Sequence, residues 1–276
     1  MKRLYLLLFI VAISFLISCG KVSDTIWDEH FISLFNPTDE IIKETSGGIQ
    51  DLAIEIQSKD STCYLGQMLG NDEIFYLTLA FDSLYNISPD DDDFKVSISA
   101  QDIIFFNNNF TPREISGQLI VDSFSFDYEQ NKTTCIICFS PKDSSLEKGE
   151  EILMVINKIL ITKGDETITS YGPFETTFPV NISTPTKKAN LKDATEQQIG
   201  HVSLSSFKLT VNLLETNTDT IDPLIDSIKL ITDNDTIVPQ GFFSRSHNSV
   251  SWIFKELIDL NAIEYIEVDG VQVKIQ

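Results

Sequence analysis

The fold class is decided by a short stretch near the C-terminus, EYIEVDGVQVKI (residues 264–275). Asp-Gly between two alternating segments is the strongest short hairpin signal, because a type I′ turn needs positive φ at both central residues. One apolar face of this hairpin is formed by Ile266, Val268, Val271, Val273 and Ile275. A hairpin alone is only marginally stable in water, so this one must pack against further strands.

The same alternation of apolar and polar residues recurs upstream in two groups of short segments. The first group comprises residues 75–82, 94–99, 119–128, 134–139, 152–161 and 174–180, and the second comprises residues 207–214, 225–232 and 250–254. Clusters of Gly, Pro, Asn and Asp separate the segments, as is typical of turns between strands. Apart from a short helical turn at residues 39–44, no helix is indicated. The pattern predicts an all-β protein built from sandwiches.

The alternation breaks in a polar, locally basic stretch around Pro185, which is typical of a connection between domains. We therefore predict two β-sandwich domains in tandem, at residues 46–183 and 201–276, with a linker at residues 184–200. The residues that precede the first sandwich, 19–45, are predicted to form a tether.

The N-terminus has the layout of a secretory signal: Lys2 and Arg3, then the uncharged residues 4–17. This apolar run is too short to cross a bilayer, which takes about 20 residues. The following Leu16-Ile17-Ser18-Cys19 resembles the bacterial lipobox, in which the cysteine is diacylated and becomes the new N-terminus. An ordinary signal peptide with an incidental cysteine is the alternative.

The lipobox resemblance implies removal of residues 1–18 and attachment to a membrane through lipid on Cys19, because two acyl chains make a stable anchor. The predicted location is the bacterial cell envelope, facing outward from the cytoplasmic membrane or the outer membrane. Gly20 in place of Asp would permit outer-membrane sorting in a Gram-negative host.

Composition narrows the classes of partner. The 276 residues carry a net charge of −21, and 42% of them are hydrophobic, which is typical of a folded chain. The acidic balance argues against nucleic acid or a bare anionic membrane as partner, since both are bound through basic patches. Solubility on an exposed surface explains the charge; a cationic partner or bound Ca²⁺ is the alternative.

Three cysteines remain besides Cys19, namely Cys63, Cys135 and Cys138. One disulfide is conceivable outside the cytosol, and Cys63 could pair with either of the other two. The Cys135-Ile136-Ile137-Cys138 motif lies in a predicted buried strand, where residues three apart point to opposite faces. We therefore interpret these cysteines as structural rather than as a redox pair or a zinc site.

Four segments carry a family resemblance: Gly48-Ile49, residues 172–180 (GPFETTFPV), residues 202–207 (VSLSSF) and residues 266–270 (IEVDG). They are similar to an uncharacterised family of extracytoplasmic immunoglobulin-like domains of Gram-positive bacteria, often found as the outer part of membrane-bound anti-sigma factors. The resemblance covers about residues 46–276. It implies immunoglobulin-like sandwiches and an outward-facing sensing or binding role. It supplies no catalytic residues, and the lipobox replaces the membrane helix and sigma-binding segment of typical members.

No catalytic motif is evident. The three histidines, His30, His201 and His247, lack partners at metal-ligand spacing, and we interpret them as exposed or hydrogen-bonded. Four aromatic residues, Trp27, Tyr64, Tyr85 and Tyr171, could line a sugar or peptide site if they are exposed, but most aromatic residues of a sandwich belong to its core. Five Asn-x-Ser/Thr sequons, at Asn86, Asn109, Asn131, Asn181 and Asn234, are interpreted as incidental turn sequences.

Asp90-Asp91-Asp92-Asp93 is the one candidate for a metal site in the sequence, since calcium takes six to eight oxygen ligands. These adjacent aspartates lack the alternate spacing and the turn glycine of an EF-hand, so a solvated loop is the alternative. No other cofactor is predicted.

The favoured function is a lipid-anchored surface protein with a noncatalytic binding or structural role toward an envelope protein or glycan. An accessory of extracytoplasmic signalling or stress sensing is the first alternative. A wall or glycan hydrolase is the second, and it would need two carboxylates about 5–10 Å apart in the fold.

Overall fold

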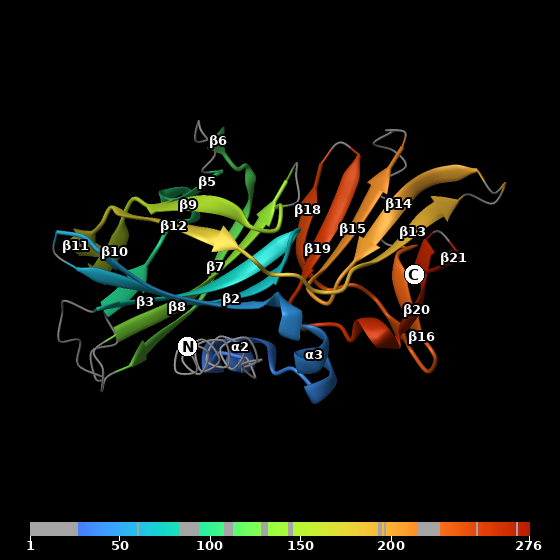
Figure 1. Ribbon diagram of the computed structural model, residues 1–276, viewed down its shortest axis with the longest axis horizontal. Helices are drawn as coiled ribbons and strands as arrows, with labels where there is room; N and C mark the ends of the chain where they lie inside the picture. The colour runs from blue at the N-terminus through green and yellow to red at the C-terminus, as the bar shows by residue number, and fades with distance from the viewer. Residues whose placement is uncertain are drawn as a thin grey trace, which may run out of the picture.

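The computed structural model describes residues 27–59, 61–82, 94–107, 113–127, 132–142, 146–192, 195, 197–214, 227–246, 248–268 and 270–276. Its helices are α2 (Glu29–Phe35) and α3 (Asp39–Glu44), with single 3₁₀ turns η1 (Ser46–Gly48), η2 (Ala100–Asp102) and η3 (Leu260–Ala262). All other described elements are β-strands, which form two blocks side by side (Figure 1). The predicted all-β sandwich architecture is confirmed.

The first block, residues 46–183, contains three sheets. Sheet A has the order β1 (Ile49–Gln57), β2 (Thr62–Asn71), β3 (Ile74–Asp82), β8 (Lys132–Pro141), β7 (Gly117–Asp127). Sheet C has the order β12 (Phe174–Val180), β9 (Glu150–Ile156), β5 (Ile103–Asn107), β6 (Arg113–Glu114). Sheet B has the order β11 (Glu166–Tyr171), β10 (Ile159–Lys163), β4 (Phe94–Ser97).

The core of the first block lies between sheets A and C. The Phe105 ring on β5 lies 4.5 Å from the Phe139 ring on β8 and 5.5 Å from the Phe75 ring on β3. All three side chains are at most 3% exposed. Aromatic rings at these separations attract one another beyond the free energy of burial, so they fix the face-to-face packing of the two sheets. The apolar run predicted as one strand, residues 152–161, is divided here between β9 and β10.

The second block, residues 187–276, contains two sheets. Sheet D has the order β13 (Lys187–Lys192), β14 (Gln198–Leu204), β15 (Lys208–Leu213), β19 (Ser249–Phe254), β18 (Gly241–Arg245). Sheet E has the order β17 (Thr236–Ile237), β16 (Lys229–Thr232), β20 (Ile263–Val268), β21 (Val271–Lys274).

The C-terminal hairpin forms as the sequence predicts. Val268 on β20 pairs with Val271 on β21, which leaves a two-residue turn. Gly270 in that turn has a φ of 76°, a value that favours glycine. Ile266 and Val268 join the buried core of the second block, so the predicted apolar face is the inner face of sheet E.

The main sheets of the two blocks share one topology. Sheet A has three consecutive strands, β1–β2–β3, and then β8 and β7; sheet D has β13–β14–β15, and then β19 and β18. In each sheet the chain leaves for another sheet after the third strand and then returns as an antiparallel pair, β7–β8 or β18–β19. The later strand of the pair lies beside the third strand: β8 beside β3, and β19 beside β15. The described strands therefore contain an internal structural repeat that the sequence does not reveal.

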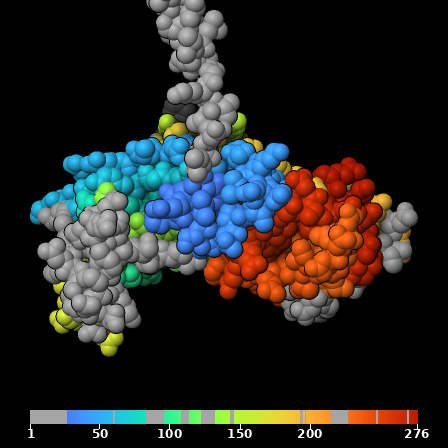
Figure 2. All heavy atoms as spheres, turned by 90° about the horizontal axis from the view of Figure 1, so that it is seen from below, coloured from blue at the N-terminus to red at the C-terminus, as the bar shows by residue number. Residues whose placement is uncertain are grey.

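A third apolar cluster joins the blocks. Its buried members are Trp27, Phe31, Phe35, Ile41, Leu69, Ile74, Tyr76, Ile136, Cys138, Phe207, Ile253 and Leu257. Tyr76, on the outer face of sheet A, lies at its centre: its ring centroid is 4.9 Å from that of Phe35 on α2 and 5.9 Å from that of Phe207 in the second block. Figure 2 shows α2 and α3 (blue) lying across the junction between the first block and the second (orange and red).

The predicted tether, residues 19–45, is wrong for residues 27–45. Trp27, Phe31 and Phe35 are at most 6% exposed, so this segment is part of the third cluster. Asp28 caps α2 by accepting a hydrogen bond from the backbone N–H of His30 (2.8 Å), and its own N–H donates to Oε1 of Gln67 (2.8 Å). Phe31 and Phe35, four residues apart, lie on one face of α2, and the Trp27 ring just before the N-cap packs against both.

The predicted linker, residues 184–200, is also wrong in large part. Residues 187–192 form β13, which pairs with β14 from Gln198 onward. The basic and polar residues of β13 belong to a sheet edge, where charged side chains are favoured, and this explains why the segment has the composition of a linker.

The predicted burial and opposite faces of the paired cysteine motif are confirmed. Cys135 lies in the core of the first block, whereas Cys138 lies in the third cluster on the opposite face of β8. All three described cysteines are free thiols. Cys63 on β2 and Cys135 on β8 have β3 between them and are offset by two residues along it, so their backbones are more than about 10 Å apart, too far for a disulfide. Burial raises the pKa of the Cys63 thiol to about 12.

We predict that Phe31→Ala lowers the free energy of unfolding by about 3–5 kcal/mol, because it leaves a cavity at a fully buried site. Urea unfolding measures the effect. Ile32→Ala is the matched control, since Ile32 is 41% exposed on the same helix, and a change within about 0.5 kcal/mol is expected. Equal effects of the two substitutions would show that α2 does not pack as described.

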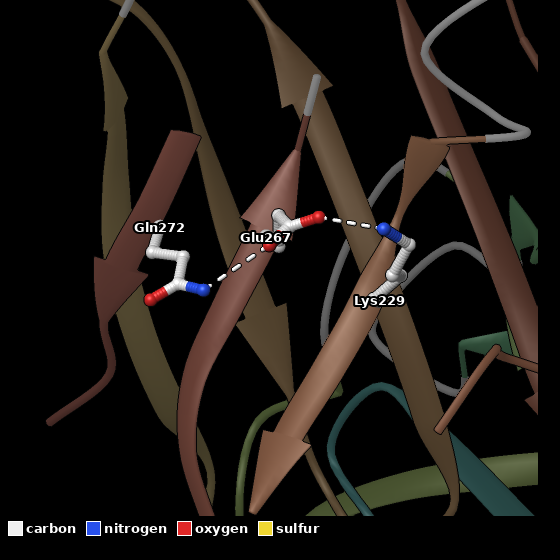
Figure 3. Close-up of polar contacts among 3 residues, drawn as sticks. All are labelled: Lys229, Glu267 and Gln272. Carbon is white, nitrogen blue, oxygen red and sulfur yellow. Dashed lines mark hydrogen bonds and ion pairs between the residues drawn. The ribbon is translucent and has the colours of Figure 1, made fainter. Parts of the chain in front are cut away.

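A second prediction concerns a polar row on the outer face of sheet E (Figure 3). Glu267 accepts hydrogen bonds from Lys229 Nζ (2.7 Å) and Gln272 Nε2 (3.1 Å), and these donors lower the pKa of its carboxyl. Because its pKa is lowered, Glu267 stabilises the folded chain at every pH above the ordinary glutamate pKa. This contribution is lost as the pH falls through the lowered pKa. An NMR titration should show Glu267 ionising at lower pH than an ordinary glutamate, and Lys229→Met should raise its pKa. An unchanged pKa in that variant would contradict the interaction.

Candidate functional site

A polar cleft lies where the outer face of sheet D meets the first block. Its volume is ≈ 520 Å³. The floor is a row of residues in direct cross-strand register: Lys188, Ser203, Thr210, Ser251 and Ser244, one from each strand of sheet D. Alternate residues on the same strands, such as Val202, Val211 and Val250, point into the core of the second block. The row is therefore the outward set of a half-buried sheet.

A second row runs beside the first, formed by Asn190, His201, Asn212 and Ser249. All of these except Asn190 line the cleft. The floor consequently presents small hydroxyl and amide groups, with the exposed imidazole of His201 among them. Hydroxyls and amides both donate and accept hydrogen bonds, so the floor can bind a hydroxylated ligand in several orientations.

The facing wall comes from strand ends of the first block. It is formed by Glu73 in the turn between β2 and β3, by Gly117 and Gln118 at the start of β7, and by Ser140, Pro141 and Lys142 at the end of β8. Asn71 fixes the turn, because its Oδ1 accepts hydrogen bonds from the backbone N–H groups of Glu73 (3.0 Å) and Ile74 (3.1 Å). The position of the Glu73 side chain is thus determined by the local sequence.

Hydrogen bonds across the cleft tie the wall to the floor. Ser203 Oγ donates to Glu73 Oε1 (2.9 Å), and Lys208 Nζ donates to Ser140 Oγ (2.8 Å). Ser140 Oγ in turn donates to the backbone carbonyl of Glu73 (3.1 Å). Lys208 is 7% exposed; burial lowers its pKa, and the nearby Glu73 acts in the opposite direction. These bonds hold the base of the cleft closed.

A second set of hydrogen bonds between the parts of the molecule lies at α3. Glu44 Oε1 accepts a hydrogen bond from Ser206 Oγ (2.6 Å), and Oε2 accepts one from Asn261 Nδ2 (3.0 Å). Burial raises the pKa of the Glu44 carboxyl, and the charge of Asp259 acts in the same direction. The helical segment is therefore bound to the second block by polar as well as apolar contacts, and the two walls of the cleft have one relative position.

The charge of the cleft is opposite to that of the chain. Three lysines line it, Lys142, Lys188 and Lys208, whereas Glu73 is the single acid among the described lining residues. The whole chain carries a net charge of −21. Composition alone indicates a solvated acidic surface and does not show this local reversal.

The structure places few of the residues predicted as sites in this cleft. His201 is part of it, whereas His30 lies on α2. Trp27, predicted as an exposed aromatic, is 3% exposed, because it packs in the third cluster. Tyr64 lies under Lys132, whose Nζ is 4.4 Å from the ring centroid, and Tyr171 packs against the first core. The aromatic-site interpretation is wrong for Trp27.

Several predicted residues lie outside the described part of the chain: Cys19, Asp90, Asp91, Asp92, Asp93, Tyr85, His247, Asn86, Asn109 and Asn131. Within the described part, no three His, Cys, Asp or Glu side chains are grouped so that they could hold a metal ion. The described helices include none with the length and apolar character of a membrane span.

The sequence does contain a signal for the cleft. Residues 201–212 and 249–251 alternate apolar residues with Ser, Thr and Asn where exposed sheet faces more often carry longer charged side chains. Small polar residues leave room above the sheet. The facing wall has no such signal, because Glu73 and Ser140 are far from these strands in the sequence and meet them only in the fold.

Comparison with known proteins supports the fold. The chain is similar to a solved structure described as a conserved domain protein from Bacillus anthracis, with a TM-score of 0.51 and 13% sequence identity. The match covers 87% of this chain and 83% of that one. No family model matches the sequence, and no curated protein shows significant similarity to it. The similarity extends over both blocks and concerns the fold alone.

We predict that the Lys208–Ser140 bond stabilises the junction. Ser140→Ala should lower the free energy of unfolding by about 1–3 kcal/mol, because it leaves the buried ammonium without its hydroxyl partner. In a Lys208→Met background the same substitution should cost less, with a coupling of at least about 0.5 kcal/mol in a double-mutant cycle. Ser183→Ala, at an exposed site, is the control. Additive effects of the two substitutions would show that the bond does not stabilise the junction.

Proposed function

We propose that this chain is a lipid-anchored protein of the bacterial cell envelope that binds a ligand noncatalytically in the cleft between the two blocks. The observation that carries the proposal is the cleft itself: ≈ 520 Å³ of polar space whose two walls are held together by the third cluster and by hydrogen bonds. Ligand sites in proteins usually have volumes of about 300–1,000 Å³. A preformed site also avoids the free-energy cost of ordering its walls on binding.

The anchor is supported by the sequence of residues 1–20. With α2 capped at Asp28, the span from Cys19 to Asp28 reaches at most about 30 Å when fully extended. A lipid on Cys19 would therefore hold the two blocks close to the membrane surface rather than on a long stalk.

Binding is favoured over hydrolysis by the acids of the cleft. Two-carboxylate glycosidases need a pair of acids about 5–10 Å apart. The described lining offers Glu73, whose Oε1 already accepts the hydrogen bond from Ser203. A signalling accessory, as the family resemblance suggests, would use the same cleft to sense its ligand.

The anchor is tested by detergent phase partition after expression in a bacterium that processes lipoproteins. The wild-type chain should enter the detergent phase, and Cys19→Ser should leave it, because the variant has no thiol to acylate. Equal partition of the two chains would contradict the lipid anchor.

The cleft is tested by hydrogen exchange of the purified mature chain with and without an extract of envelope glycans. Backbone amides of β14, β15 and β19 should gain protection, and Ser251→Trp should abolish the gain, because an indole fills the floor. Ser183→Trp, at an exposed site of the first block, should leave the protection intact. Protection that survives Ser251→Trp would contradict binding in the cleft.

A further inference from the structure

We infer that the ligand of the cleft is an anionic, hydroxylated molecule, a short saccharide that carries phosphate or carboxylate groups. The inference rests on the cleft being the binding site proposed above, and it names the chemical class that the site fits.

The positions of the basic side chains give the first argument. Lys188 lies on edge strand β13 in the floor row, while Lys142 and Lys208 lie toward the wall of the first block. Four spacings of about 4.8 Å separate the edge strands, so the floor is about 19 Å wide. Lysines at the β13 edge and along the wall therefore border the floor on two sides. A ligand lying along the floor would meet a basic group at the β13 edge and others at the wall.

The floor gives the second argument. Beyond Lys188 the row offers Ser203, Thr210, Ser251 and Ser244. The hydroxyls of such a row can donate and accept hydrogen bonds with hydroxyl groups of a ligand. A sugar carries such hydroxyls on every ring.

The third argument concerns Glu73, because its carboxylate is the group of the cleft that would repel an anionic ligand. Its Oε1 accepts the hydrogen bond from Ser203, and its charge acts favourably on buried Lys208. These contacts direct the Glu73 carboxylate toward the junction. Its negative charge offsets the positive charge of Lys208 at the base of the cleft. Lys142 and Lys188, both exposed, are the basic groups of the rim.

The net charge of the chain limits the size of the ligand. At physiological ionic strength charges are screened beyond about 8 Å, so the basic lining dominates inside the cleft. A long polyanion such as nucleic acid would extend beyond the cleft over a chain whose net charge is −21. A single phosphate ion would leave most of the hydroxyl row unused. A short anionic saccharide matches both the charge and the length.

The test is isothermal titration calorimetry of the full mature chain, purified in detergent, with matched probes. Trehalose 6-phosphate and digalacturonate represent the two sources of negative charge on a saccharide. Trehalose supplies the hydroxyls alone, inorganic phosphate supplies the charge alone, and a short oligodeoxynucleotide supplies charge on a different polymer. We expect at least one anionic saccharide to bind at least tenfold more tightly than trehalose, phosphate and the oligonucleotide.

Substitutions then assign the binding to the cleft. Lys188→Met should weaken the anionic saccharide about tenfold, because it removes a hydrogen bond to a charged group. Ser251→Trp should abolish binding. Lys163→Met, on β10 of the first block, makes the same change of charge far from the cleft and should have no effect.

Three results would overturn the inference. Trehalose binding as tightly as its phosphate would show a neutral saccharide site. Phosphate or the oligonucleotide binding as tightly as the saccharides would show that charge alone suffices. Failure of every probe, while envelope extract still protects β14, β15 and β19, would refute the anionic class and leave the cleft as the binding site. Loss of that protection as well would refute the proposed function itself.

Discussion

The arrangement of this protein depends on the Tyr76 side chain and the two rings that contact it. Tyr76 points away from the core of its own sheet and packs against Phe35 of α2 and Phe207 of the second block. Phe207 stands at the tip of the β14–β15 hairpin, in a turn closed by the Ser205 N–H to Lys208 carbonyl bond (2.9 Å). Burial of an aromatic side chain stabilises a structure by about 1.5–3 kcal/mol, and here that burial is shared by three elements. The relative position of the blocks follows from it.

The cleft is a consequence of this junction and of the repeated topology. The hairpins that meet there, β2–β3 and β14–β15, occupy equivalent places in sheets A and D. The turn of the first contributes Glu73, and the strands of the second contribute Ser203 and Thr210. A repeated fold thus uses one hairpin as the wall and its counterpart as part of the floor. The polar ties between Lys208, Ser140 and Glu73 reinforce a geometry that apolar packing establishes.

Local patterns in the sequence predicted the local structure well. The Asp269-Gly270 hairpin, the strands around Phe75, Cys135 and Trp252, and the opposite faces of Cys135 and Cys138 all follow from alternation with a period of two. The predictions failed where only the composition of a segment was considered and the spacing of its apolar residues was not. Trp27, Phe31 and Phe35 looked like part of a tether, although their four-residue spacing is that of a helix face. The basic residues of β13 looked like a linker because edge strands and linkers have similar compositions.

The site could be predicted only in part. The outward residues of sheet D can be found from the alternation in residues 201–212, but the wall that makes them a cleft comes from residues at least 59 positions earlier, from Lys142 back to Glu73. The net charge of the chain gives no sign of the lysines that gather around the cleft. Long-range packing decides which charged groups meet, and neither composition nor periodicity contains that information.

The central claim is that the two blocks form one rigid unit, and spin-label distance measurement tests it most directly. Labels at Glu175→Cys on β12 and Lys192→Cys on β13, both exposed, report across the junction in a Cys19→Ser chain, where the other cysteines are buried. The structure predicts a single narrow distance distribution that broadens when Phe207→Ser is introduced. A broad distribution in the otherwise unchanged chain would show that the blocks move independently, and it would contradict a preformed cleft.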